Sequence, residues 1–254
     1  MSEHITETVS TEVRERVLVV RIDREAKRNA IDPDITAGSG TALDRLDDDP
    51  ELWAGVITGT TAVFSAGTDL KAGMSSTERG GNYGIIERRR QKPLIAAVEG
   101  FALGGGMEVV LACDLVVAST TASFGLPEVH RSLVPTCGGM FRAPRALPLN
   151  VAREMLLTGD AIDAERAERV GFVNRLVGPG EALDAAVALA QRICRNGPVG
   201  IRETMTVLAG LVADDDVEAW RLTRVAEAVI YAADDTKEGV TAFFERREPR
   251  WTGR

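Results

Sequence analysis

Short apolar runs separated by polar segments dominate the first part of the chain. These runs are rich in Val, Ile and Leu, and most end at Gly, Pro or a charged residue. Apolar runs of strand length with β-branched residues are typical of buried strands. We therefore predict strands at residues 16–22, 53–58, 94–98, 115–118, 122–124 and 172–177.

Helical patterns alternate with these strands and then replace them. Asp32 followed by Pro33 is typical of a helix start, because aspartate caps the first turn and proline fits its first position. Asp163 and Gly171 mark the start and the end of a further helix in the same way. The helix that follows Asp32 and Pro33 is predicted at residues 35–46. Further helices are predicted at residues 83–91, 151–157, 181–195, 199–213, 216–232 and 236–247.

The pattern changes near Pro198. Strand–helix units of irregular length precede this residue, and no strand pattern follows it. We predict an α/β core over residues 1–197 and a helical region over residues 198–254. Periodicity alone leaves two cores open, stacked β-turns or a doubly wound sheet. Within the core, residues 73–84 contain four glycines and no apolar periodicity, which predicts a mobile loop of the kind that forms a lid.

The stretch from residue 95 to residue 114 carries the strongest chemical signal. A strand is followed by three glycines, Gly104, Gly105 and Gly106, and then by an apolar helix interrupted only by Glu108. Free amides at such a helix start favour negative charge, and burial raises the pKa of a carboxyl group. Acid–base chemistry on a carbonyl is one interpretation; close helix packing with a glutamate near the dipole is the other. The spacing fits neither GxGxxG nor a phosphate loop.

Bulk properties exclude several classes of protein. The net charge of −8 argues against a nucleic-acid surface. The three cysteines, Cys113, Cys137 and Cys194, lack CxxC spacing, which fits a reducing cytoplasm and not a disulfide scaffold. With only two histidines, we expect no metal site. No apolar run reaches about 18 residues, so we expect neither a signal peptide nor a membrane span and predict a cytoplasmic protein.

Motifs along most of the chain resemble the enoyl-CoA hydratase (crotonase) family. Residues 23–30 (DREAKRNA) are similar to its NRPxxxNA loop, with Asp23 and Glu25 in place of the usual Asn and Pro. Residues 64–70 (FSAGTDL) and 124–128 (FGLPE) are similar to its FxAGAD[IL] and FGxPE segments. Further matches lie at residues 92–98, 138–139, 157–159, 171–174 and 238–249.

The resemblance implies a fold and a way to bind substrate. The fold is a crotonase-like spiral of ββα turns with a C-terminal α-helical trimerisation region, in a trimer or a dimer of trimers. The substrate is an acyl-CoA thioester, whose oxygen is held by the backbone N–H groups of Thr68 and Gly105. Thr68 stands where the family usually has Ala, which changes a side chain but not the amide donor. No cofactor is expected, since CoA is part of the substrate.

Two glutamates distinguish the hydratase branch of the family, and both are present as Glu108 and Glu128. By resemblance, they hold one water and add it across the double bond of a 2-enoyl-CoA. Residues 134–142 resemble carnitinyl-CoA dehydratase-like members, which perform the same chemistry on a polar acyl group. A non-catalytic acyl-CoA scaffold is disfavoured by the two intact glutamates, and an RNA-binding role by the charge.

Weaker candidates concern the rest of the substrate. Lys27 and Arg28 are expected at the CoA phosphates, although a solvated charged loop explains them equally well. Arg246, with Arg247, is expected at the 3′-phosphate of a CoA bound in its own or a neighbouring subunit, although compensation of a helix dipole is the alternative. The motifs add four substrate-binding candidates: Ala66, Asp69, Leu70 and Gly104. Cys137 is expected to line the pocket, and His130 is given no catalytic role.

Overall fold

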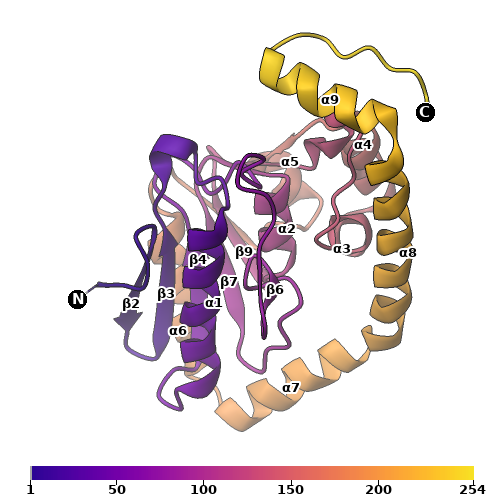
Figure 1. The fold of residues 1–254 in the computed structure, drawn as a ribbon. Helices are drawn as coiled ribbons and strands as arrows, with labels where there is room; N and C mark the ends of the chain where they lie inside the picture. Colours follow the sequence, from indigo (N-terminus) through magenta and orange to yellow (C-terminus); the bar gives the residue numbers. More distant parts are fainter. Residues whose placement is uncertain (1) are drawn as a thin grey trace.

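A seven-stranded sheet forms the frame of the molecule (Figure 1). The computed structural model describes residues 2–254. The two N-terminal strands of the sheet pair antiparallel with their neighbours, and the remaining neighbours are parallel. In spatial order the strands are β1 (Glu3–His4), β2 (Val9–Arg14), β3 (Val17–Ile22), β4 (Ala54–Thr58), β7 (Leu94–Val98), β9 (Leu115–Ser119) and β12 (Arg175–Val177).

A second sheet of three strands is connected to the first through β7. Its order is β11 (Ile162–Asp163), β10 (Ser123–Gly125) and β8 (Phe101–Leu103). Strand β8 follows β7 after only two residues, and Gly100 makes this step with a φ of 58°. A Cβ at Gly100 would lie 2.1 Å from the carbonyl oxygen of Ala62, so no larger residue fits. Strands β7 and β8 with helix α2 (Gly105–Leu111) form one ββα turn of a spiral.

Both faces of the main sheet are covered, which explains the continuous apolar runs in its strands. In β3, Leu18 and Val20 join the core that also contains α1 (Pro33–Asp48), whereas Val17 and Val19 face α6 (Ala182–Cys194). These four side chains are at most 2% exposed. The loops that follow the carboxyl ends of β4 and β7 then carry the candidate site.

The helices after β10 build the other half of the molecule. Helices α3 (Gly139–Ala146), α4 (Leu149–Thr158) and α5 (Ala164–Arg169) follow the second sheet. Helix α7 (Pro198–Gly210) then leaves the body, α8 (Ala213–Ala232) returns along its side, and α9 (Asp234–Glu245) closes over the top (Figure 1). None of the helices in residues 2–254 is long and apolar enough to cross a membrane.

Helices α7 and α8, residues 198–232, are called the helical arm below. The arm contacts the body where the Trp220 ring packs on Phe141 of α3 at 4.9 Å and where Asp216 pairs with Arg145. Much of its apolar surface has no partner within residues 2–254. Apolar arm residues at least half exposed are Val199, Val207, Leu208, Leu211, Val217, Leu222, Val225, Val229 and Tyr231.

Some sequence-based predictions were wrong in detail. The polar leader contains β1 and β2, and the strand β8 before the glycines was missed. The helix predicted at residues 83–91 is a series of turns, because Tyr83 and Gly84 have φ values of 57° and 75°. The loop predicted at residues 73–84 contains a small hairpin of β5 (Ser76–Thr77) and β6 (Gly81–Asn82). The last core strand begins at Arg175 instead of residue 172.

Candidate active site

The fold brings Glu108 and Glu128 together from two separate segments. Glu108 lies on α2, and Glu128 lies on the 3₁₀ helix η2 (Pro127–Arg131). Glycines allow the close approach of both carboxylates. A Cβ at Gly104 would lie 3.2 Å from Glu128 Oε1, and a Cβ at Gly139 would lie 3.1 Å from Glu108 Oε1. Gly104 is the N-cap of α2, one turn before Glu108, so Glu128 lies beside the first turn of the helix that carries Glu108.

Glu108 is held in a dry environment. Glu108 is only 2% exposed, and its Oε1 atom accepts a hydrogen bond of 2.9 Å from the Gly139 amide. Burial, followed by the charge of Glu128, raises the pKa of Glu108 to about 8. The amides of Gly139 and Cys137 oppose this rise but do not cancel it. Glu108 can therefore carry a proton near neutral pH.

Glu128 is less enclosed by hydrogen bonds. Burial raises the pKa of Glu128 to about 7, against its own backbone amide and the nearby Arg131 guanidinium. Its Oε2 atom is buried and has no hydrogen-bond partner within residues 2–254. Buried polar atoms are nearly always paired, so an unpaired one beside a second carboxylate is suited to meeting a ligand.

Two backbone amides are free on the glycine-lined side of this pair. Thr68 forms a parallel bridge with Ile31, in which Ile31 donates to the Gly67 carbonyl and Asp69 donates to the Ile31 carbonyl, each at 2.8 Å. The N–H of Thr68 therefore points away from Ile31. The N–H of Gly105, at the first position of α2, has no helical acceptor.

The two amides lie on segments that touch. Gly67 has a φ of 96°, and a Cβ there would lie 3.1 Å from the Gly105 nitrogen. Within the described residues, neither the Thr68 amide nor the Gly105 amide donates to a protein acceptor. Two unpaired donors beside two carboxylates of raised pKa are the arrangement expected for chemistry on an acyl group.

Residues 12–254 match the family model described as enoyl-CoA hydratase/isomerase. The chain belongs to the enoyl-CoA hydratase/isomerase family. The resemblance seen in the motifs and the crotonase-like spiral with C-terminal helices are thereby confirmed.

Relatives in the family span nearly the whole chain. The carnitinyl-CoA dehydratase of Salmonella enteritidis PT4 is 38% identical over 94% of this chain and 95% of its own length. The crystal structure of a carnitinyl-CoA hydratase from Mycobacterium avium is 40% identical, with a TM-score of 0.93 over 98% of this chain and 99% of that one. An enoyl-CoA hydratase from Mycobacterium tuberculosis H37Rv is 42% identical, with a TM-score of 0.79 over 97% and 99%.

The other predicted binding residues lie in two places. Arg28 O accepts a 2.9 Å hydrogen bond from the Ala66 amide, so the exposed Lys27–Arg28 loop adjoins the Thr68 segment. Leu70 is 38% exposed on the same segment. Asp69 pairs with Arg24 at 2.8 Å and accepts hydrogen bonds from two following amides, so its carboxylate holds the loop together.

The arginines of the tail directly follow α9. Arg246 ends this helix and is exposed. Arg247 pairs with Glu238 and Glu245, which ties its guanidinium to its own chain. These pairs raise the pKa of Arg247 and lower that of Glu238 to about 2. The predicted phosphate contact of Arg247 therefore competes with two carboxylates.

Helix α9 supports the segment that carries Glu128. Thr236 Oγ1 donates to the Ser132 carbonyl at 2.9 Å, and Gly239 lies so close to Arg131 that a Cβ would be 2.4 Å from its carbonyl oxygen. The Arg131 guanidinium stacks 4.1 Å from the Phe243 ring. The amphipathic pattern of the tail predicts a partner surface in the same subunit or in a neighbouring one, and it does not identify η2 as the surface that α9 covers.

Tyr83 is the functional candidate that sequence reasoning missed. It was assigned to a helix, yet its ring is buried, at 3% exposed, and its hydroxyl lies 2.7 Å from Thr68 Oγ1. The threonine in place of the usual alanine was the available signal. Cys137 is buried, and burial raises its pKa, which makes it a poor nucleophile. His130 contacts the Thr158 carbonyl at 2.7 Å.

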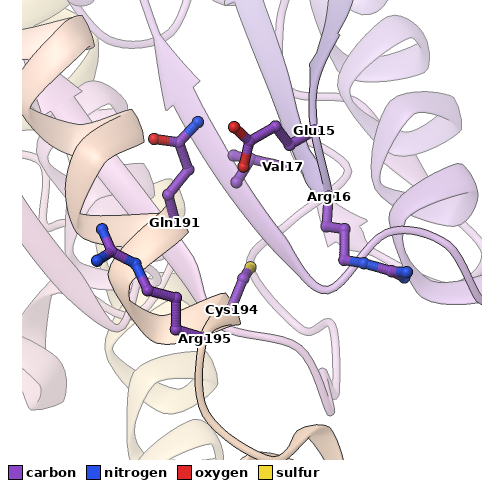
Figure 2. A pocket seen from close by; sticks show the side chains of 6 residues that line it. All are labelled: Glu15, Arg16, Val17, Gln191, Cys194 and Arg195. Atoms are coloured by element: carbon purple, nitrogen blue, oxygen red, sulfur yellow. The ribbon is translucent and has the colours of Figure 1, made fainter.

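A separate hollow of about 440 Å³ is shown in Figure 2, and neither Glu108 nor Glu128 lines it. It is formed by the turn between β2 and β3 and by the last turn of α6. This position is at the amino end of β3, whereas the free amides follow the carboxyl ends of β4 and β7. Its lining residues are Glu15, Arg16, Val17, Gln191, Cys194 and Arg195.

Proposed function

We propose that this protein is an enoyl-CoA hydratase that adds water reversibly across the double bond of a 2-enoyl-CoA. The observation that carries the proposal is the neighbouring pair of buried carboxylates, Glu108 and Glu128, beside the free amides of Thr68 and Gly105. Membership in the enoyl-CoA hydratase/isomerase family supports it.

The two carboxyl groups are suited to hold one water between them. As the water oxygen bonds to C3 of the acyl group, one carboxylate accepts a proton from it and a proton is delivered to C2. The product is a 3-hydroxyacyl-CoA, and no redox step or further cofactor takes part. Burial raises the pKa of both carboxyl groups, which suits them to hold and release a proton near neutral pH.

The amides of Thr68 and Gly105 act on the thioester. Negative charge develops on the thioester oxygen as water adds, and preorganised donors stabilise that charge more than the neutral carbonyl. Each such donor typically lowers the free-energy barrier by about 3–4 kcal/mol. Gly105 adds the dipole of α2. For the CoA part we propose Lys27, Arg28 and Arg246 at the phosphates, with the remaining contacts from Ala66, Leu70 and Gly104.

A direct assay tests the proposal. The purified protein is mixed with a panel of 2-enoyl-CoAs of increasing chain length, and the absorbance of the conjugated enoyl thioester is followed. We expect this absorbance to fall as the 3-hydroxyacyl-CoA forms. A folded protein that hydrates none of the panel would contradict the proposal.

The second candidate function is a carnitinyl-CoA dehydratase-like activity. It is favoured by the Salmonella and M. avium relatives, whose names specify carnitinyl-CoA. The reaction is the same, and the acyl group carries a polar or charged end. Including an enoyl-CoA with a terminal trimethylammonium group in the panel separates the candidates, because the preferred substrate has the higher kcat/KM.

The oligomeric state belongs to the same proposal. We propose a trimer or a dimer of trimers, assembled through the helical arm in the cytoplasm. The support is the set of apolar arm side chains exposed in the single chain, such as Leu211 at 73% and Val217 at 69%. Contiguous exposed apolar surface of this kind marks protein interfaces.

A further inference from the structure

Thr68 and Tyr83 form a hydroxyl pair next to the two free amides. Their oxygens are 2.7 Å apart, which is the usual length of an O–H···O hydrogen bond. The tyrosine ring also packs on Gly105, since a Cβ built there would lie 2.8 Å from the Tyr83 hydroxyl. A single side chain thus touches both residues whose amides are proposed to hold the thioester oxygen.

Of the two hydroxyl hydrogens in this pair, only one is used in the hydrogen bond between the two oxygens. Each hydroxyl has one hydrogen, and the hydrogen bond between the two oxygens consumes one of them. Within residues 2–254, neither hydroxyl forms another hydrogen bond to an oxygen or nitrogen, and the further hydrogen-bond neighbour of Tyr83 is the weakly accepting Cys137 thiol. One O–H group therefore remains beside the Thr68 and Gly105 amides.

The backbone at Tyr83 is held in an unfavourable conformation. Its φ of 57° lies in the left-handed region, which is rare for a bulky aromatic residue. The β5–β6 hairpin holds it there, and the Tyr83 amide donates to the Ser75 carbonyl at 3.1 Å. Such backbone strain is found preferentially at functional sites. It orients this ring towards Thr68 and Gly105.

We infer that the Tyr83 hydroxyl is a third hydrogen-bond donor to the thioester oxygen, oriented by the Thr68 hydroxyl, which donates to it. The phenol is the more acidic of the two hydroxyls and so the better donor. Burial, with Cys137 and Glu108 nearby, raises the pKa of Tyr83 well above 10, so the phenol keeps its proton wherever the glutamates work. The inference rests on the proposed function, because it assigns a thioester to the site.

Two readouts test the inference with Tyr83→Phe, which removes the hydroxyl and keeps the ring. The first is kcat on the best enoyl-CoA of the panel, which we expect to fall about 10-fold with KM nearly unchanged, as for loss of one hydrogen bond to a developing charge. The second is the carbonyl stretching frequency of bound butyryl-CoA in infrared difference spectra. This saturated ligand is not hydrated, and we expect a smaller shift from its free value in the variant.

Matched variants separate the donor from its partner. Thr68→Val keeps the amide and the side-chain shape, and we expect only about a 2–3-fold loss of kcat, because the phenol still donates. Thr61→Val is the control, since Thr61 is an exposed threonine in the same loop after β4. It should leave kcat and the infrared shift unchanged.

The outcomes distinguish this inference from the proposed function. Wild-type kcat and an unchanged infrared shift in Tyr83→Phe would overturn the donor role, even in an active hydratase. A larger loss in Thr68→Val than in Tyr83→Phe would overturn the assignment of the donor to tyrosine. If the wild type hydrated no enoyl-CoA, the proposed function would fail, and the infrared shift of bound butyryl-CoA would still report on the hydroxyl.

Discussion

The spiral core and the helical arm use similar apolar residues in opposite ways. Val117 in β9 is 0% exposed, whereas Val217 in α8 is 69% exposed. In the core, the strands β3, β4, β7 and β9 bury apolar side chains of the same chain on both faces. In the arm, the apolar positions have helical spacing but meet little protein. An amphipathic pattern therefore identifies a buried face without telling which chain buries it.

The polar residues of the two regions differ as well. Charged groups on the arm pair with close neighbours at the surface, as Arg221 does with Glu218, and such pairs contribute little to stability. In the core, Glu108 is buried on an apolar helix beside Glu128, and its pKa is raised. A polar exception inside an apolar region is thus the informative signal, and the predictions below test each side of this contrast.

The largest effect is expected from the core carboxylates. Glu108→Gln and Glu128→Gln keep the shape of each side chain and remove its proton chemistry, so hydration should slow by about 10²–10⁴-fold. The measurement is kcat on the best enoyl-CoA. The matched control is Glu154→Gln, an exposed glutamate on α4 paired with Arg166, which should keep wild-type activity. Full activity in either core variant would exclude the two-glutamate mechanism.

The next effect concerns the Gly105 amide. Gly105→Pro removes the N–H, and we expect turnover to fall by about 10²-fold or more. Gly105→Ala keeps the N–H, but its Cβ would press on the Tyr83 hydroxyl at 2.8 Å, so it is not a neutral control. The ratio of kcat between the two variants isolates the amide. Equal losses would mean that this N–H does not contact the substrate.

The third prediction addresses the arm. Val229→Glu places a charge on an exposed apolar position of α8, and we expect the association constant of the oligomer to fall about 10-fold or more, because the carboxylate must lose its water at the interface. Sedimentation velocity across a concentration series measures this. The control is Arg224→Glu, which adds negative charge to an exposed polar position of the same helix. A wild type that is monomeric and fully active would contradict an assembly through the arm.

The sequence predicted the core elements well because their patterns are local. The strand–glycine–helix unit at residues 94–111 is visible in the chain, and so is the pair Glu108 and Glu128 once the family motifs are recognised. The helix starts at Pro33 and Ala164 follow from caps that the structure confirms, since Asp32 and Asp163 accept hydrogen bonds from Ile35 and Arg166.

Features that depend on distant contacts were beyond the sequence. The polar strand β2 forms because it pairs antiparallel with the edge of β3, whereas its own sequence shows only a weak alternation of apolar and polar residues. Tyr83 enters the site only because turns replace a helix at residues 83–91, where Arg88 is buried against Asp44 and Asp47 of α1. Likewise, the packing of α9 on η2 joins residues about a hundred positions apart, for which no periodic pattern exists.

The smallest expected effect is on stability, and it has the opposite sign to the effect on activity. The pKa of Glu108 is raised from 4.5 to about 8 in the folded protein. The stability that its proton provides is complete below pH about 4.5 and is lost as the pH rises through about 8.

Glu108→Gln stays neutral throughout. The Tm of the variant should therefore gain on that of the wild type by several degrees between pH 5 and pH 9, since about 1 kcal/mol corresponds to about 2–4 °C at this size. Thermal unfolding of both proteins across this range measures the gap. Glu154→Gln should show no such gain, because Arg166 lowers the pKa of Glu154 instead. A gap that is constant or shrinks with pH would mean that Glu108 is already ionised in the folded core, and the contrast between a dry core carboxylate and the solvated charges of the arm would be wrong.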